Sequence, residues 1–155
     1  MQQVRTETSR QPSILPTLEE TRLSPVVHLL TGDVVNLVAE TCRSFEDRAS
    51  FGGNGLFINR ISPALWMAHQ IEAVAELVNE PRFANARPII IEAPITALMH
   101  PDTPMACEAA AARSRLCPQE ICVEVEDATL SQSKSDIVRS IEALRRRGFR
   151  VGVNA

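Results

Sequence analysis

The residues of this sequence that most readily perform chemistry are its cysteines and histidines, which are the usual protein ligands of zinc. They are Cys42, Cys107, Cys117, Cys122, His28, His69 and His100. No two cysteines form a Cys-x-x-Cys pair, and no histidine follows them at the spacing of a zinc finger. We therefore interpret the cysteines as structural thiols and assign the histidines no special role.

Glycines and arginines could instead bind phosphate. Gly52, Gly53 and Gly55 lie in an irregular stretch, 46–61, but it matches neither GxxxxGK[ST] nor GxGxxG, so we expect a plain loop. The run Arg145–Arg147 suits the negative end of a helix dipole. With a net charge of −3 and a pI near 5.6, the chain has no general attraction for nucleic acid or anionic membranes. We expect neither partner.

The wider pattern places the chain among cytoplasmic proteins of one domain. No stretch approaches the roughly 20 apolar residues of a membrane span, and the N-terminus lacks the apolar core of a signal peptide. Residues 1–20 are polar and contain two prolines, which predicts a flexible N-terminal tail. The remaining residues, 21–155, are enough for one domain with a hydrophobic core.

Apolar periodicity predicts an α/β domain with the element order β-β-α-β-α-β-α-β. Two strands, 25–30 and 34–42, are joined by a turn at Thr31-Gly32, and their Val and Leu content suggests burial on both faces. The later elements are a helix over 62–79, a strand over 89–93, a helical turn over 95–99, a helix over 104–115, a strand over 120–126, a helix from Ser133 or Ser135 to Gly148, and a strand over 150–154. The last two strands and their helix form a βαβ unit, whose strands run parallel.

Two stretches carry a resemblance to a known family. Residues 24–43, SPVVHLLTGDVVNLVAETCR, resemble the opening QPIVDLxTGxxxGxEALxR of EAL domains. VEVEDATL, a helix ending LRRRGF, and VGVNA resemble the region LEITES, helix, LxxxGxxIxxDDFG of the same family. EAL domains are TIM-type barrels that hydrolyse, or only bind, cyclic di-GMP. A complete barrel needs about 250 residues, so the resemblance, over 23–155, implies an incomplete TIM-barrel-like repeat of about half the strands.

The resemblance also assigns positions to the metal site of active relatives. The first Glu of LEITES falls on Glu124, which keeps its identity, whereas the Glu of the EAL triplet falls on Val38. The asparagine of the [IV]N[IVL]S strand falls on Glu92, and the two aspartates of DDFG fall on Asn154 and Ala155. The glutamine and arginine that help to hold the dinucleotide fall on Ser24 and Cys42.

Hydrolysis of cyclic di-GMP needs water activated by divalent cations, which carboxylate and amide oxygens hold. The candidate ligand-binding residues that remain are Glu124, Glu40, Glu92 and Asn154, with Glu40 presented inward by a bulge or a local shift of its strand. The alternative interpretation of Glu124 is a strand carboxylate paired with a neighbouring arginine or with a helix N-terminus. We expect no catalytic residues, no metal site and no cofactor, with Mg²⁺ required only if the site is active.

These substitutions favour a non-catalytic, degenerate EAL-like regulatory module that binds another protein. The alternatives are a receptor that binds cyclic di-GMP and a fragment of a cyclic di-GMP phosphodiesterase.

An incomplete barrel leaves two sheet edges and the inner sheet face open. We expect that face to be apolar, formed by Ile89–Ile91, Val123, Val125, Val151 and Val153. A large exposed apolar area needs a cover. The sequence therefore predicts a homodimer or a tight complex through the open side of the sheet, with Arg150–Asn154 at or near the contact.

Overall fold

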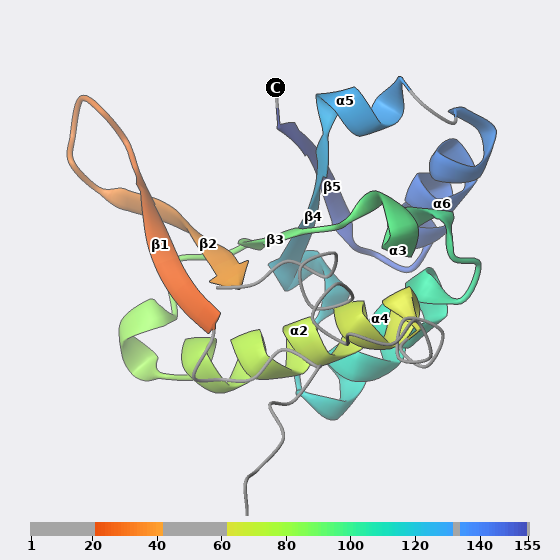
Figure 1. The fold of residues 1–155 in the computed structure, drawn as a ribbon. Coiled ribbons are helices and arrows are strands. Elements are labelled where there is room, and N and C mark those ends of the chain that lie inside the picture. The colour runs from red at the N-terminus through yellow and green to blue at the C-terminus, as the bar shows by residue number, and fades with distance from the viewer. Residues whose placement is uncertain (1–20, 42–61, 132–133, 155) are drawn as a thin grey trace, which may run out of the picture.

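The computed structural model describes residues 21–41, 62–131 and 134–154, and within them one mixed sheet of five strands. The strands lie in the order in which they occur along the chain: β1 (Thr21–Val27), β2 (Val34–Thr41), β3 (Ile89–Glu92), β4 (Ile121–Glu126) and β5 (Arg150–Asn154). β1 is antiparallel to β2, and the strands from β2 to β5 are parallel (Figure 1). The α/β fold class and the incomplete barrel are thus confirmed. The expected tail, 1–20, and the glycine-containing loop, 46–61, lie outside the described residues.

The helices follow the predicted order with small shifts at their ends. They are α2 (Pro63–Val78), α3 (Ile95–Met99), α4 (Thr103–Arg113), α5 (Asp127–Leu130) and α6 (Lys134–Arg146), with 3-10 turns η2 (Pro81–Phe83) and η3 (Pro118–Glu120). Helix α2 begins where predicted, because Pro63 at the first helical position has the required backbone angle and no N–H to satisfy. The short helix α5 was not predicted, since its four residues are too few for a visible period.

The hairpin of β1 and β2 was predicted, and β2 begins at Val34 as expected, but β1 is displaced along the sequence. β1 begins at Thr21 rather than residue 25, and residues 28–33 form the connecting loop. His28 N–H donates to Asp33 O, and Gly32 N–H donates to His28 O, both at 2.8 Å. Gly32 adopts a φ of +75°, which suits a residue without a side chain.

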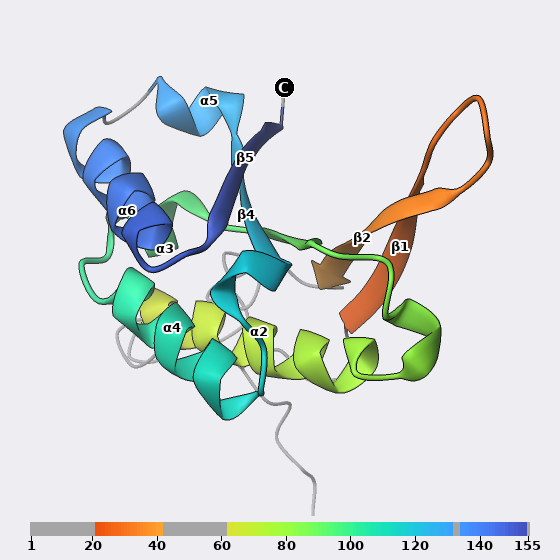
Figure 2. The ribbon, with the colours of Figure 1, turned by 180° about the vertical axis from the view of Figure 1, so that it is seen from behind.

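The helices cover one face of the sheet, and the core lies between them (Figures 1 and 2). In Figure 2, α2 and α4 run side by side beneath the strands. The core joins Met67, Ile71 and Val74 of α2 to alternate residues of the parallel strands, all fully buried: Ile89, Ile91, Ile121, Val123 and Val125. These strand side chains therefore meet the helices.

The expectation of an apolar inner face was consequently wrong. Ile89, Ile91, Val123 and Val125 are all buried in the core, and Val151 packs against it. The residues between these buried ones on each strand project from the opposite face, which is partly apolar and partly polar. It presents half-buried Ile90, Cys122 and Glu124 and exposed Glu92. Burial on both faces was also wrong for the outer half of the hairpin, whose Val and Leu side chains are exposed.

None of the helices in the described parts of the chain is both long enough and apolar enough to cross a membrane.

Candidate functional site

The candidate site lies on the sheet face opposite the helices, toward the carboxyl ends of the parallel strands. Glu92 of β3 pairs in register with Glu124 of β4, and Glu124 pairs with Gly152 of β5. Neighbouring strands are about 4.8 Å apart, so the two carboxylates are within reach of one small ligand. The structure therefore brings together two of the four residues that the sequence proposed.

Glu40 of β2 shares this face, but its carboxylate is turned toward β1 and away from β3. It stands two residues beyond Val38, which pairs with Ile90, so the side chains of Glu40 and Val38 project from the same face. The Ser24 hydroxyl of β1 donates to Glu40 Oε2 at 3.0 Å, which directs that carboxylate toward the hairpin. The register shift between β1 and β2 lies at Val26 and Val27, near the other end of the hairpin, so the expected bulge does not act at Glu40.

Asn154 lies two residues beyond Gly152 on β5, and so further toward the carboxyl end of the sheet than the two carboxylates. It ends β5, is exposed, and pairs in register with Glu126 of β4 rather than with Glu124. Ala155, which the family resemblance places at the second aspartate, lies outside the described residues.

Cys122 lies behind Glu124 on the same face, between Ile90 and Arg150 in the register of the sheet. Burial raises the pKa of its thiol, the charge of Glu124 raises it further, and Arg150 lowers it. A side chain at Gly152 would bring a Cβ to 3.3 Å from Cys122 Sγ, so the glycine leaves the space beside Cys122 and Glu124 open. The thiol is thus a neutral neighbour of the carboxylate pair.

The carboxylate pair could bind a cation or a ligand. Within the described residues, no group of three or more His, Cys, Asp or Glu side chains is close enough to hold a metal ion. Mg²⁺ is often held by one or two carboxylates together with substrate phosphates and water. Glu92 and Glu124 could supply the protein part of such a site, whereas Val38, at a further ligand position implied by the family resemblance, has no donor atom.

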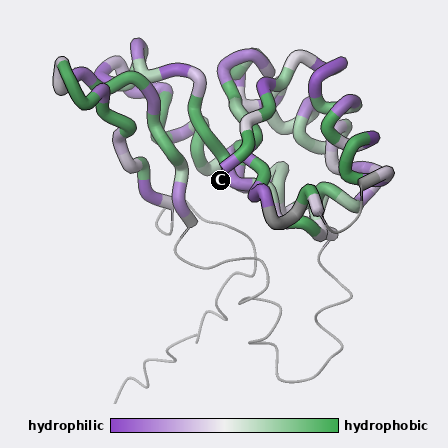
Figure 3. Tube along the Cα trace, turned by 90° about the horizontal axis from the view of Figure 1, so that it is seen from above, coloured by the Kyte–Doolittle hydropathy of each residue, from purple (hydrophilic) through white to green (hydrophobic). Residues whose placement is uncertain are grey.

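The sequence did not reveal a second feature, the exposed apolar surface of the hairpin. We call it the hairpin tip, and it consists of Val26, Val27, Leu29, Leu30, Val34 and Val35. Leu29 and Leu30 are 98% and 92% exposed, and the hairpin projects from the helical body in Figure 1. Its loop is among the hydrophobic parts of the trace in Figure 3. The two leucines directly before the turn at Thr31-Gly32 could have indicated this exposure, because residues next to a turn are rarely buried.

At its base, the hairpin meets the segment after α2. A cavity of about 280 Å³ separates them, lined by apolar Leu23, Val34, Leu37 and Phe83 among others. Arg82 stacks over the ring of Phe83, with its guanidinium carbon 4.5 Å from the ring centre. The apolar surface of the hairpin thus continues into a recess beside the sheet.

Comparison with known proteins identifies the fold. No protein-family model and no curated protein sequence matches the chain. Among solved structures, BlrP1 of Klebsiella pneumoniae, in a calcium and cyclic di-GMP complex, matches with a TM-score of 0.66 and 14% identity over 86% of this chain and 34% of that chain. The PaMucR phosphodiesterase, in a cyclic di-GMP complex, matches with a TM-score of 0.62 and 16% identity, over 86% and 57%. The FimX EAL domain matches with a TM-score of 0.59 and 17% identity, over 88% and 58%.

The described part of the chain therefore has the fold of part of an EAL domain, as the sequence resemblance predicted. The chain spans 34% to 58% of the length of these three matched chains. At this level of identity the likeness establishes the fold alone, because function is determined by the residues of a site.

Proposed function

We propose that this chain is a non-catalytic, EAL-like regulatory module that acts in the cytoplasm by binding protein. The observation that carries the proposal is the hairpin tip, where two leucines are almost fully exposed beside four exposed valines. Large exposed apolar areas mark sites that a partner covers, and exposed apolar side chains gather on this hairpin. The free thiols of Cys107, Cys117 and Cys122 agree with a reducing compartment.

The lack of catalysis is proposed from the residues at the strand ends. Val38 replaces the glutamate of the EAL triplet, and Asn154 replaces the first aspartate of DDFG. The Ser24 hydroxyl donates to Glu40, a carboxylate two residues beyond Val38 on the same strand that could substitute for the missing glutamate. Activation of water by metal ions depends on several oxygen ligands around each ion, and these replacements remove them.

A second copy of the chain is the simplest partner. In the part of the sheet that the structure describes, β1 and β5 are the two edges, and the four strands from β2 to β5 are parallel. Two copies would together supply as many parallel strands as a complete TIM-type barrel. A different protein could instead cover the hairpin tip and the open sheet face.

Sedimentation and light scattering at micromolar concentration test the proposal with the double substitution Leu29→Ser and Leu30→Ser. We expect the wild type to form a dimer and the double variant to be a monomer with an unchanged circular dichroism spectrum. The control is Met105→Ser on α4, where a side chain 58% exposed is removed from a different surface. A wild type that is monomeric and well folded across the concentration range would contradict self-association.

A receptor for cyclic di-GMP is the second candidate function, and the pairing of Glu92 with Glu124 favours it. Two adjacent carboxylates could bind a cation that in turn binds a phosphate of the dinucleotide. Calorimetry with and without Mg²⁺ distinguishes the two functions, because a receptor would show a saturable site that requires the cation.

A further inference from the structure

One face of the hairpin is apolar from its base to its tip. Leu23, Pro25 and Val27 alternate along β1, so they share a face. Their partners in register on β2 are also apolar: Ala39, Leu37 and Val34. The base of this face is covered, since Leu37 is 3% exposed, whereas Val27 and Val34 are 42% and 50% exposed. The apolar face thus continues beyond the covered part of the sheet toward Leu29 and Leu30.

The recess at the base of the hairpin has room for those two leucines. Its volume is about 280 Å³, and its lining includes Leu37, Phe83 and Ala86. An apolar cavity of about 150 Å³ takes up a benzene ring of six carbon atoms, so this recess has room for roughly two leucine side chains of four carbon atoms each. Leu29 and Leu30 are 98% and 92% exposed. The chain therefore carries both an apolar recess and a pair of apolar side chains that matches it in size.

The leucines cannot reach the recess of their own chain. Val27 lies about 13 Å beyond Leu23 along β1, at roughly 3.3 Å per residue, and the leucines follow after it. A second copy can supply them, because a two-fold axis makes the same patch contact itself in two copies. With the axis crossing the hairpin midway between tip and base, each tip lies on the base of the other hairpin. Both pairs of leucines are then covered at once.

The charges beside the tip and the recess are complementary. Asp33 is exposed in the hairpin loop, close in sequence to the leucines. Arg82 lines the recess, is 68% exposed, and pairs through its Nε with Glu80 Oε2 at 2.7 Å. Its guanidinium stacks over the ring of Phe83, which leaves it at the edge of the recess. The same two-fold axis brings Asp33 of each copy toward Arg82 of the other, and opposite charges at the rim favour this orientation.

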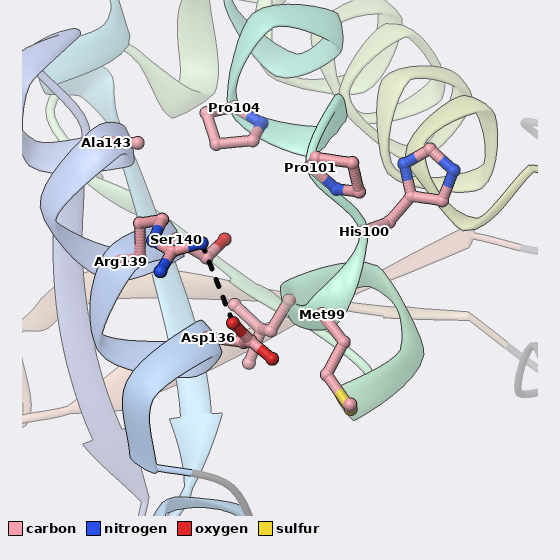
Figure 4. Close-up of a pocket in the computed structure, with 9 residues that line it drawn as sticks. Met99, His100, Pro101, Pro104, Asp136, Arg139, Ser140 and Ala143 are labelled. Carbon is pink, nitrogen blue, oxygen red and sulfur yellow. Dashed lines mark ion pairs between the residues drawn. The ribbon is translucent and has the colours of Figure 1, made fainter.

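A hollow between α6 and the segment that joins α3 to α4 is a poorer receptor for the leucines (Figure 4). Its volume is about 150 Å³, which is about half that of the recess. Asp136 and Arg139 line it and form an ion pair at 3.7 Å, the dashed line in Figure 4. Leucines placed there would remove water from both charges, which costs free energy. The recess at the hairpin base is therefore the better match.

We propose that two copies of this chain bind through their hairpins, with Leu29 and Leu30 of each copy in the recess at the base of the other hairpin. This inference rests on the proposed function, because it specifies the surface and the orientation of self-association. β5 is the opposite edge of the described sheet. Association through β5 would use a separate surface.

Disulfide cross-linking tests the orientation. In a Cys42→Ser, Cys117→Ser background, one variant carries Thr31→Cys at the tip and another carries Asn85→Cys at the recess, both at exposed positions. A disulfide forms only where the two Cβ atoms approach to about 4 Å. After mild oxidation we expect a covalent dimer in the equal mixture and little in either variant alone. The matched control is Ala112→Cys on α4, also exposed, which should not link to Thr31→Cys.

A charge exchange tests the rim contact by sedimentation equilibrium. Asp33→Lys and Arg82→Glu should each raise the dissociation constant of the dimer about 5-fold, the upper value for an exposed ion pair. The double variant should restore it, because the two side chains attract again. The matched control is Arg139→Glu on α6, which makes the same change of charge at a side chain 77% exposed and should leave the dimer unchanged.

The outcomes separate this inference from the proposed function. Efficient cross-linking of Thr31→Cys with itself would show that the tips meet each other, and would overturn the inference while self-association stands. A dimer in sedimentation without the expected cross-link, or without rescue in the charge exchange, would overturn it in the same way. A wild type that stays monomeric would contradict both the inference and self-association.

Discussion

Glu92 and Glu124 are direct neighbours across β3 and β4, with their Cα positions in register on two parallel strands. Gly152 continues the same row on β5, so the row offers two carboxylates followed by a position without a side chain. The predicted lack of hydrolysis depends on what these two carboxylates can do.

The purified chain should not hydrolyse cyclic di-GMP in the presence of Mg²⁺ or Mn²⁺. Val38 and Asn154 stand where ligands of the metal ions are expected, and the remaining carboxylates are too few to organise metal-bound water for attack. Chromatography of the nucleotide after incubation measures the linear product. Metal-dependent product that disappears in Glu124→Gln would refute this prediction and make Glu92 a second ligand.

Cyclic di-GMP should bind weakly or not at all. Ser24 stands where active relatives have a glutamine, and its hydroxyl already donates to Glu40 at 3.0 Å. Cys42, which lies outside the described residues, cannot form the two parallel hydrogen bonds that a guanidinium makes to phosphate. Isothermal calorimetry should show no saturable heat at micromolar nucleotide. A single saturable site, lost in Glu124→Gln, would favour the receptor.

The sequence predicted the elements well because their periods are local. Alternation over 120–126 correctly separated buried Ile121, Val123 and Val125 from half-buried Cys122. The same alternation does not state which face the helices cover, because the two faces of a strand are equivalent in the pattern. The inner face was therefore predicted to be apolar when the apolar side chains face the helices.

Contacts between distant segments could not be predicted in the same way. The pairing of Glu92 with Glu124 depends on strand register, which is determined by packing of the whole sheet. The exposure of Leu29 and Leu30 depends on what lies beside the hairpin, and a run of Val and Leu does not indicate whether anything does.

A negative charge on the edge strand β5 should weaken self-association. Val153 is in register with buried Val125, so it belongs to the helix-covered face, but it is 55% exposed on the edge strand β5, beside which no further strand is described. Val153→Glu therefore places a charge next to the free edge of the sheet. Light scattering should show a lower mass at a given concentration. Val138→Glu on α6, where the side chain is 49% exposed, is the matched control. An unchanged mass in the β5 variant would exclude β5 from the contact.

Cys107 should resist thiol reagents until the protein unfolds. Burial raises the pKa of this thiol from 9.0 to about 12, so the reactive thiolate is scarce at pH 8. In a Cys42→Ser background, exposed Cys117 should be modified quickly and Cys107 only after urea is added. Rapid modification of Cys107 in the native protein, located by mass spectrometry, would contradict its burial.

The raised pKa of Cys107 also predicts a loss of stability in alkaline solution. The unfolded chain begins to release this proton near pH 9, whereas the folded chain keeps it until about pH 12. The unfolded state then binds fewer protons, and the free energy of unfolding falls as the pH rises through that range. Urea titrations between pH 8 and 10 should show a smaller decline in Cys107→Ala than in the wild type. Equal declines would show that other groups cause the alkaline loss.

The ends of α4 and α6 share a hydrogen-bond pattern but differ in the residue that completes it. Phe149 N–H donates to Leu144 O, and Gly148 adopts a φ of +92°. At the end of α4, Leu116 N–H donates to Ala111 O in the same way. The residue in the left-handed conformation there is Arg115, with a φ of +58°. Both ends are Schellman motifs, in which glycine is preferred.

Arg115→Gly should therefore stabilise the protein, and Gly148→Ala should destabilise it. A side chain in the left-handed region costs about 1–2 kcal/mol, and the greater freedom of glycine in the unfolded chain offsets about half of this. We expect a gain of roughly 0.5–1 kcal/mol for Arg115→Gly and a loss of about 1 kcal/mol for Gly148→Ala, measured by urea denaturation. Gly32→Ala is the control for Gly148→Ala. Gly32 also has a positive φ, +75°, but no atom lies within 4 Å of a Cβ added there. A Cβ added at Gly148 would lie 2.8 Å from Gln119 Nε2. The loss at Gly148 should exceed that at Gly32, since Gln119 must also move. A destabilised Arg115→Gly variant would mean that the Arg115 side chain contributes more to the fold than its backbone strain costs.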